Sequence, residues 1–133
     1  MVKMSPLILV FAFFFTECGT FSERARLESF SEISTAYQKA LQRADYKTAY
    51  RYLDPATVGK EVDLKRYKNI KVVEYETSNI RVSEDHTEIN LDVEISYHYL
   101  NDPILKTITD KQFWKYKEEE KGWMIQTGLP DFN

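Results

Sequence analysis

The most regular hydrophobic pattern in the chain is an alternation of apolar and polar residues from Thr87 to Tyr99. The apolar positions are Ile89, Leu91, Val93, Ile95, Tyr97 and Tyr99. Side chains on a β-strand point alternately to the two faces of its sheet, so this period places all of them on one face. The pattern predicts a long strand with one face on a hydrophobic core.

Between Ser22 and Ala44 the apolar residues recur instead at steps of three and four, which predicts an amphipathic helix. They are Leu27, Phe30, Ile33, Tyr37, Ala40 and Leu41. Asp45 can cap a second, shorter helix that reaches Leu53. Asp54-Pro55 ends that helix, because a residue that precedes proline disfavours helical backbone. The two helices have almost no linker and must turn sharply against each other.

Further strands are predicted for Asn69–Glu76 with Asn79–Ser83, for Leu105–Lys117 and for Trp123–Thr127. At about 3.3 Å per residue the two longest strands would each extend about 40 Å, too far for a domain of this size to hold them straight. The sheet must therefore curl, and we expect β-bulges to allow it. Helices followed by a strongly curled antiparallel sheet make an α+β fold.

Residues 1–17 differ from the rest of the chain. They carry one basic residue, Lys3, and an uninterrupted apolar run from Leu7 to Phe15. That run would span about 14 Å as a helix, about half of a bilayer core, which suits a signal peptide better than a membrane anchor. We therefore divide the chain into a signal peptide (1–17), a lipidated N-terminus with a short tether (18–22), one α+β domain (23–128) and a loose C-terminal tail (129–133).

Cys18, the single cysteine of the chain, directly follows this segment. A basic start, a short apolar run and then a cysteine resemble the signal of bacterial lipoproteins. The resemblance implies that Cys18 is lipidated and becomes the first residue of an exported protein anchored in the cell envelope. Glu17 is not a small residue, so a plain signal peptide cleaved elsewhere and an uncleaved anchor remain alternatives.

Composition narrows the functional classes. The chain has 133 residues, enough for one ordinary domain, and 43% of them are hydrophobic. A net charge of −3 without a run of basic residues argues against nucleic-acid binding. With two histidines, His86 and His98, and no cysteine other than Cys18, we expect neither a metal site nor a cofactor.

From Ser22 to Thr127 the pattern resembles the nuclear transport factor 2-like superfamily, which includes limonene-epoxide hydrolase, ketosteroid isomerase and polyketide cyclases. Three segments carry the resemblance: ALQRADYKTAYRYLDP (Ala40 to Pro55), the long alternating strand, and FWKYKEEEKGWMI (Phe113 to Ile125). It implies a cone in which the curled sheet surrounds the helices. A cystatin-like fold, with one helix on a curled sheet, is the alternative, and the second helix argues against it.

Asp110 is the candidate catalytic residue. If Ile108, Trp114 and Tyr116 face the core, then Asp110 and Gln112 on the same strand face it too. A carboxylate in an aromatic cavity would have a raised pKa and could act as a general base. The predicted ligand pocket comprises Tyr37, Tyr50, Tyr97, Asp110, Gln112 and Trp114. A bulge at 110–112 would instead turn Asp110 and Gln112 into water, and since the curl requires a bulge somewhere, this second arrangement is favoured.

Opposite charges are predicted on neighbouring strands of the outer sheet face. Glu88, Asp92 and Glu94 share one face of the alternating strand, and the next strand carries Lys111, Lys115 and Lys117. They predict either a solvated charge ladder or a surface for a homodimer or an envelope protein partner.

Taken together, the residues favour a lipid-anchored envelope domain without catalytic activity that binds a protein partner or a small apolar ligand. One alternative is a cone-fold enzyme of the hydrolase, isomerase or cyclase type with Asp110 as the base. The other is a dimeric scaffold.

Overall fold

The computed structural model describes residues 17–59, 63–120 and 122–132 of the chain, with side chains from Ser22 onward. Within these residues the fold is α+β, with one four-stranded antiparallel sheet that is not closed. The signal peptide predicted for residues 1–17 lies outside the described residues except for the backbone of Glu17, and so does the side chain of Cys18.

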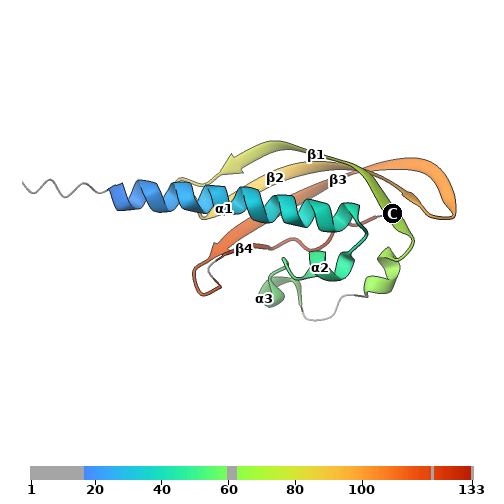
Figure 1. Cartoon of the computed structure of the whole chain (residues 1–133), viewed down its shortest axis with the longest axis horizontal. Coiled ribbons are helices and arrows are strands. Elements are labelled where there is room, and N and C mark those ends of the chain that lie inside the picture. Colours follow the sequence, from blue (N-terminus) through green and yellow to red (C-terminus); the bar gives the residue numbers. More distant parts are fainter. Residues whose placement is uncertain (1–16, 60–62, 121, 133) are drawn as a thin grey trace, which may run out of the picture.

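One long helix, α1 (Glu17–Gln42), runs along the sheet (Figure 1). It is the helix that the apolar spacing predicts, but it begins five residues earlier than Ser22, so the backbone of residues 18–22, predicted as a short tether, is helical. Three short helices follow it, α2 (Tyr46–Tyr50), α3 (Pro55–Val58) and the 3-10 helix η1 (Leu64–Tyr67).

The aspartates next to these short helices act as caps. Asp45 accepts hydrogen bonds from the backbone N–H and the hydroxyl of Thr48, at 3.2 and 2.7 Å, as expected of an N-cap. The helix that it starts ends at Tyr50, three residues before the predicted end. Asp54 caps α3 through the Ala56 N–H at 3.0 Å, so Asp54-Pro55 begins a new helical turn in addition to ending the previous segment.

The sheet has the strand order β1-β2-β3-β4, with β1 Ile70–Val82, β2 Glu88–Tyr99, β3 Asp102–Lys117 and β4 Gly122–Ile125. The two strand segments predicted before Ser83 form one strand, β1. The expected bulges are confirmed: the register shifts between Val72 and Glu74, between Ser78 and Arg81, and between Tyr97 and Tyr99. Asn79, inside the second shift, has φ of +50°, a conformation that asparagine adopts more readily than most residues.

The core lies between α1 and the inner, concave face of the sheet. All apolar residues of the alternating pattern from Ile89 to Tyr97 are buried there, as predicted. The indole of Trp114 is fully buried and receives two aromatic rings edge-on from α1, Phe30 at 5.5 Å and Tyr37 at 5.6 Å between centroids. These contacts hold α1 against β3.

The C-terminal segment is part of the domain, so the prediction of a loose tail at 129–133 is wrong for the described residues. Pro130 is fully buried, and the Phe132 ring lies 4.7 Å from that of Tyr97 and 6.0 Å from that of Tyr67. The segment has no periodic pattern that would have predicted this burial. Its apolar residues pack because the chain turns at Gly128, where φ is +87°.

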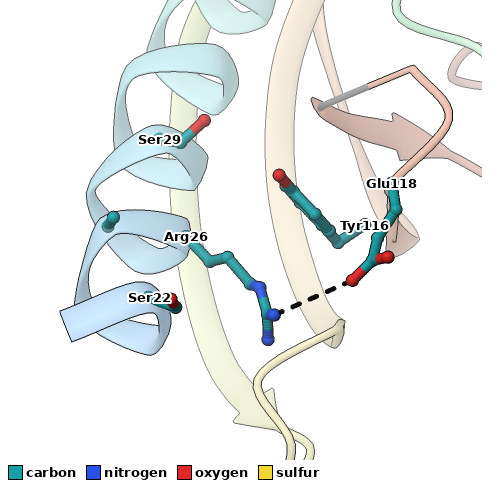
Figure 2. A pocket seen from close by; sticks show the side chains of 6 residues that line it. Ser22, Arg26, Ser29, Tyr116 and Glu118 are labelled. Carbon is teal, nitrogen blue, oxygen red and sulfur yellow. Dashed lines mark ion pairs between the residues drawn. The ribbon is translucent and has the colours of Figure 1, made fainter. Parts of the chain in front are cut away.

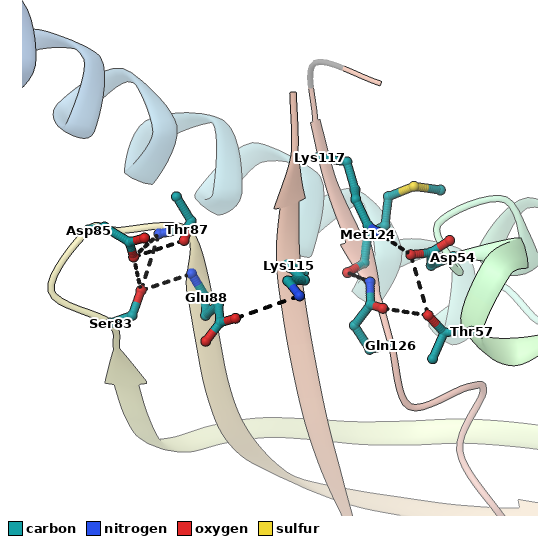
Figure 3. Close-up of polar contacts among 10 residues, drawn as sticks. All are labelled: Asp54, Thr57, Ser83, Asp85, Thr87, Glu88, Lys115, Lys117, Met124 and Gln126. Carbon is teal, nitrogen blue, oxygen red and sulfur yellow. Dashed lines mark hydrogen bonds and ion pairs between the residues drawn. The ribbon is translucent and has the colours of Figure 1, made fainter. Parts of the chain in front are cut away.

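Three contacts fasten the short helices to the sheet. Asp54 N–H donates to the carbonyl of Ile125 on β4, and Ile125 N–H donates to that of Tyr52, both at 2.8 Å. The buried carboxylate of Asp54 also lies 3.1 Å from Lys117 Nζ at the end of β3 (Figure 3). Burial acts to raise the pKa of Asp54, but hydrogen bonds from Ala56 and Lys117 outweigh it and lower the pKa.

Candidate functional site

Asp110 and Gln112 face the inside of the sheet. The pairing of β3 with β2 is continuous from Lys115 opposite Glu88 to Lys106 opposite Tyr97, with no shift at 110–112. The favoured expectation of a bulge at that place is therefore wrong, because the curl is accommodated at the three other shifts. Gln112 is 2% exposed on the same face as the fully buried Trp114.

A chain of hydrogen bonds runs along this inner face, which we call the inner polar chain (Trp114, Gln112, Tyr75 and Asp110). Trp114 Nε1 donates to Gln112 Oε1 at 2.9 Å. Gln112 Nε2 donates to the Tyr75 hydroxyl at 3.0 Å and to Asp110 Oδ2 at 2.9 Å. An indole N–H can only donate, so it fixes the orientation of the Gln112 amide, which must then present its N–H groups to the other two partners.

Asp110 is the acidic residue of the inner polar chain, and it influences the pKa values of the tyrosines around it. Burial raises the pKa of Asp110, and the hydrogen bond from Gln112 opposes the rise. No ion pair joins Asp110 to a cation among the residues that the structure describes. Burial also raises the pKa of Tyr75 and, together with the nearby Asp110, that of Tyr37, so both phenols are neutral at physiological pH. The Tyr37 hydroxyl is buried without a hydrogen-bond partner from the described part of the chain.

A groove of about 330 Å³ lies beside the inner polar chain, between α1 and strands β1 and β2, and we call it the inner groove. Its sheet side is mostly apolar, and its helix side mixes Leu27 and Phe30 with short polar side chains. The lining residues are Leu27, Phe30, Ser31, Ser34, Thr35, Gln38, Tyr75, Thr77, Ile80, Val82, Ile89, Leu91 and Gln112. Tyr75 and Gln112 belong both to the groove and to the inner polar chain, so the groove reaches Asp110 through them.

The other residues predicted for the pocket do not line the inner groove. Tyr37, Tyr97 and Trp114 are buried core residues packed against other rings, and none of them lines the inner groove. Tyr50 lies at a separate hollow of about 250 Å³ with Leu53 and Met124, and its hydroxyl donates to the Gly59 carbonyl at 3.4 Å. The structure therefore brings Trp114, Gln112 and Asp110 together but places Tyr50 apart from them.

A third, more open hollow, of about 430 Å³, lies near the start of α1 (Figure 2). The guanidinium of Arg26, which lines this hollow, already has protein partners. It lies 4.0 Å from the Glu118 carboxylate, donates to the Asp85 carbonyl at 3.2 Å and lies 5.4 Å from the centre of the Tyr116 ring. Because its cation is shared among these groups and Glu118 is exposed, this hollow does not present an unpaired charge to a ligand.

The outer sheet face carries the predicted opposite charges. Glu88 and Lys115 lie 3.8 Å apart on paired strands (Figure 3). Lys111 is in register with Asp92. Asp92 is also 3.9 Å from Arg81 of β1. Lys117 departs from this ladder because it pairs with Asp54 instead.

Sequence reasoning missed Tyr75, which completes the inner polar chain. A signal was present: Ile70 and Val72 are buried at even positions, whereas Tyr75 is the next large side chain that the sheet turns inward, at an odd position. Such a change of parity within one strand indicates a bulge, and the register does shift between Val72 and Glu74.

Searches with protein-family models, among curated proteins and among solved structures found no match for this chain. Within the described residues, no three His, Cys, Asp or Glu side chains are grouped so that they could hold a metal ion. In that same part of the chain, no helix combines the length and the apolar character needed to span a membrane.

Proposed function

We propose that the chain is a lipid-anchored domain of the bacterial cell envelope that binds a small apolar ligand in the inner groove and catalyses no reaction. The inner groove carries this proposal. Its volume of about 330 Å³ suits a small molecule, and its wall from Ile80, Val82, Ile89 and Leu91 suits an apolar body. The Gln112 amide and the hydroxyls of α1 would orient a polar group on that ligand.

The position of the groove supports a ligand that comes from the membrane. Cys18 lies in the first turn of α1, and Leu27, the first groove residue on that helix, follows nine residues later. At about 1.5 Å per residue this is about 14 Å along the helix axis. A lipid on Cys18 would therefore hold the groove close to the bilayer surface. Within the α+β class we propose the nuclear transport factor 2-like arrangement, supported by α2, which a cystatin-like fold lacks.

Dye binding tests the groove. The protein used is the chain from Glu17 onward, which contains all the core residues identified above. It carries Cys18→Ser, which removes the lipidation site, so no detergent is needed. N-phenyl-1-naphthylamine, an uncharged apolar dye with one N–H, should bind with saturable fluorescence enhancement. Ile80→Glu should weaken binding by about fivefold or more, because a charge then faces the apolar dye.

Val73→Glu is the matched control. Val73 is a 47% exposed β1 residue that does not line the groove, and Ile80 is 58% exposed on the same strand. Dye affinity should be unchanged in this variant. Equal losses in both variants, or no saturable binding in the parent, would refute a groove ligand and leave a protein partner on the outer face as the binding function.

The anchor is tested by the intact mass of the native protein extracted from membranes. A mass equal to Cys18–Asn133 plus acyl chains, lost in Cys18→Ser, is the expected result. A chain without acyl groups that begins at another residue would exclude the lipoprotein proposal and leave the groove proposal standing.

A second candidate, a cone-fold hydrolase, isomerase or cyclase with Asp110 as general base, is favoured by one observation: the carboxylate faces inward, and burial raises its pKa. Hydrolysis of p-nitrophenyl butyrate and of styrene oxide by the purified domain would support it if Asp110→Asn abolished the activity. Activity that survives Asp110→Asn, or its absence in the parent for both substrates, argues for the binding function.

A further inference from the structure

One long edge of the sheet is unpaired. Strand β3 pairs with β2 along most of its length, but β4 covers only Trp114–Lys117 on its other edge. No backbone hydrogen bond from a described residue reaches that other edge between Leu105 and Lys111. Most side chains there are exposed, with Leu105 at 57%, whereas Ile108 and Asp110 are partly buried. An unpaired edge of this length is a template for another strand.

Two backbone hydrogen bonds define which residues of β3 direct their N–H and C=O groups toward the free edge. Tyr116 N–H donates to Thr87 on the β2 side, whereas the Phe113 carbonyl accepts from Gln126 on the β4 side. In an antiparallel sheet successive residues alternate between the two sides. The residues that present both N–H and C=O to the free edge are therefore Leu105, Thr107, Thr109 and Lys111.

Asp110 gives the second, independent observation. This carboxylate is partly buried beside the free edge, and it accepts a hydrogen bond from the neutral amide of Gln112. None of the ion pairs among the described residues involves it. A buried carboxylate that lacks a cation is costly, so the site is electrostatically incomplete in a single copy.

We propose that the free edge of β3 pairs with β3 of a second copy of this chain, antiparallel about a two-fold axis at Ile108. In this register Thr107 lies opposite Thr109 of the second copy, and Leu105 lies opposite its Lys111. All four outward-pointing residues then exchange backbone hydrogen bonds with their counterparts. The interface is isologous, as expected for a dimer with two-fold symmetry.

Neighbouring registers fit less well. An axis at Thr107 places Pro103, which has no N–H, opposite Lys111. An axis at Thr109 places Phe113 opposite Leu105, but the Phe113 carbonyl already accepts from Gln126 and its N–H donates to Thr127 Oγ1 at 3.4 Å. Only the axis at Ile108 uses every free group.

The same register supplies the missing cation. It places Lys106 of the second copy directly opposite Asp110, with both side chains on the inner face and their Cα atoms about 4.5 Å apart. Lys106 is exposed in a single copy, where its Nζ lies 5.0 Å from the centre of the Tyr99 ring. The exposed apolar residues Ile104 and Leu105 at the end of β3 would be covered in the same step. The Asp110 site is thus shared between two copies.

Disulfide cross-linking of the full chain in native membranes tests the register. Ile108→Cys should give a disulfide-linked dimer on oxidation with copper phenanthroline, because residue 108 lies opposite itself within the Cα distance that a disulfide needs. Leu105→Cys mixed with Lys111→Cys should give a heterodimer. Both of these positions are exposed, so this second test does not depend on how the partly buried Ile108 tolerates substitution. The parent chain with Cys18 gives the background.

Three further variants separate edge pairing from other contacts. Thr109→Pro removes an N–H that points to the free edge and no bond to β2, so it should lower cross-linking by about tenfold while the domain stays folded. Thr109→Ala is the matched control and should cross-link normally. Lys106→Asp should weaken cross-linking, and adding Asp110→Lys should restore it.

Glu94→Cys tests for a dimer that forms through the outer sheet face instead, since Glu94 is exposed on that face. Cross-linking through Glu94→Cys but not through residues 105, 108 and 111 would overturn the proposal in favour of outer-face pairing. Absence of a dimer in every variant would exclude a second copy as the occupant of the edge. A cross-link from Ile108→Cys to a protein of different mass would also overturn it and identify a foreign strand. None of these outcomes depends on ligand binding in the inner groove.

Discussion

Strand β3 presents two contrasting surfaces one residue apart. Its inner face carries Trp114, Gln112 and Asp110, which are joined through hydrogen bonds of 2.9 Å. Its outer face carries Lys115 and Lys111, which are exposed and face acidic residues of β2. Both faces carry polar side chains, but the buried side chains of β3, Gln112 and Trp114, lie on the inner face.

This difference determines what each polar group contributes. A buried donor or acceptor that loses its partner costs about 1–3 kcal/mol, because water cannot replace the partner. An exposed ion pair contributes about 0–1 kcal/mol, because water solvates both charges when the pair breaks. Polar residues on the inner face should therefore be sensitive to substitution, and the charges on the outer face should be tolerant of it.

Trp114→Ala should have the largest effect. The indole is fully buried and packed against Phe30 and Tyr37, so its loss should cost about 3–5 kcal/mol in the free energy of unfolding. Lys115→Ala, one residue along the strand, should cost less than about 0.5 kcal/mol. Urea denaturation of the chain from Glu17, followed by circular dichroism, measures both. Similar losses in the two variants would mean that the faces do not differ.

Gln112→Leu should have the next largest effect, about 1–3 kcal/mol, because it leaves the Trp114 N–H, the Tyr75 hydroxyl and Asp110 without their shared partner. Gln126→Leu makes the same change outside the inner face, where the amide oxygen accepts from Thr57 at 2.7 Å at an exposed site (Figure 3). We expect a loss below about 1 kcal/mol for this control. The comparison fails if the control is the more damaging change.

Asp110→Asn should mainly change how the free energy of unfolding depends on pH, and should change its magnitude less. Burial raises the pKa of Asp110 in the folded state, so its contribution is most favourable when it is protonated, below the ordinary pKa of about 3.9. That contribution is lost as the pH rises through the folded-state pKa. In the monomer, where Lys106 of a second copy does not face Asp110, the variant should therefore be more stable than the parent at pH 7, and the advantage should vanish at pH about 3.

Asp85→Asn is the control of opposite sign. Hydrogen bonds from Ser83 and Thr87 lower the pKa of Asp85 in the folded state (Figure 3). This variant should be less stable than the parent at neutral pH, and the difference should disappear on acidification. Thermal unfolding at pH 3, 5 and 7 tests both variants, and parallel profiles would contradict the inward position of Asp110.

Glu88→Gln should have the smallest effect. It removes one partner of an exposed pair 3.8 Å long, so we expect a loss below about 0.5 kcal/mol that shrinks further in 1 M salt. Urea denaturation at low and high salt measures it. A loss comparable to that of Gln112→Leu would show that the outer ladder is not freely solvated.

The periodic segments could be predicted, whereas the site could be predicted only in part. Leu27 to Leu41 repeat at helical spacing and Ile89 to Tyr97 at strand spacing, and the structure confirms both elements. Asp110 was identified as a candidate, but its orientation depended on where the bulges lie. Tyr75 was missed for the same reason, since a shift between Val72 and Glu74 turns it inward.

The amino-acid sequence by itself determined the order of the elements, the α+β class and the inner face of the alternating strand, because each follows from local periodicity and from the need to bury apolar surface. Only the tertiary structure decided where the sheet bends, that Phe132 closes the core, and that Gln112 joins Trp114, Tyr75 and Asp110. These outcomes depend on how the strain of curling is distributed over the whole sheet. That distribution is set by contacts between distant residues, which no local pattern records.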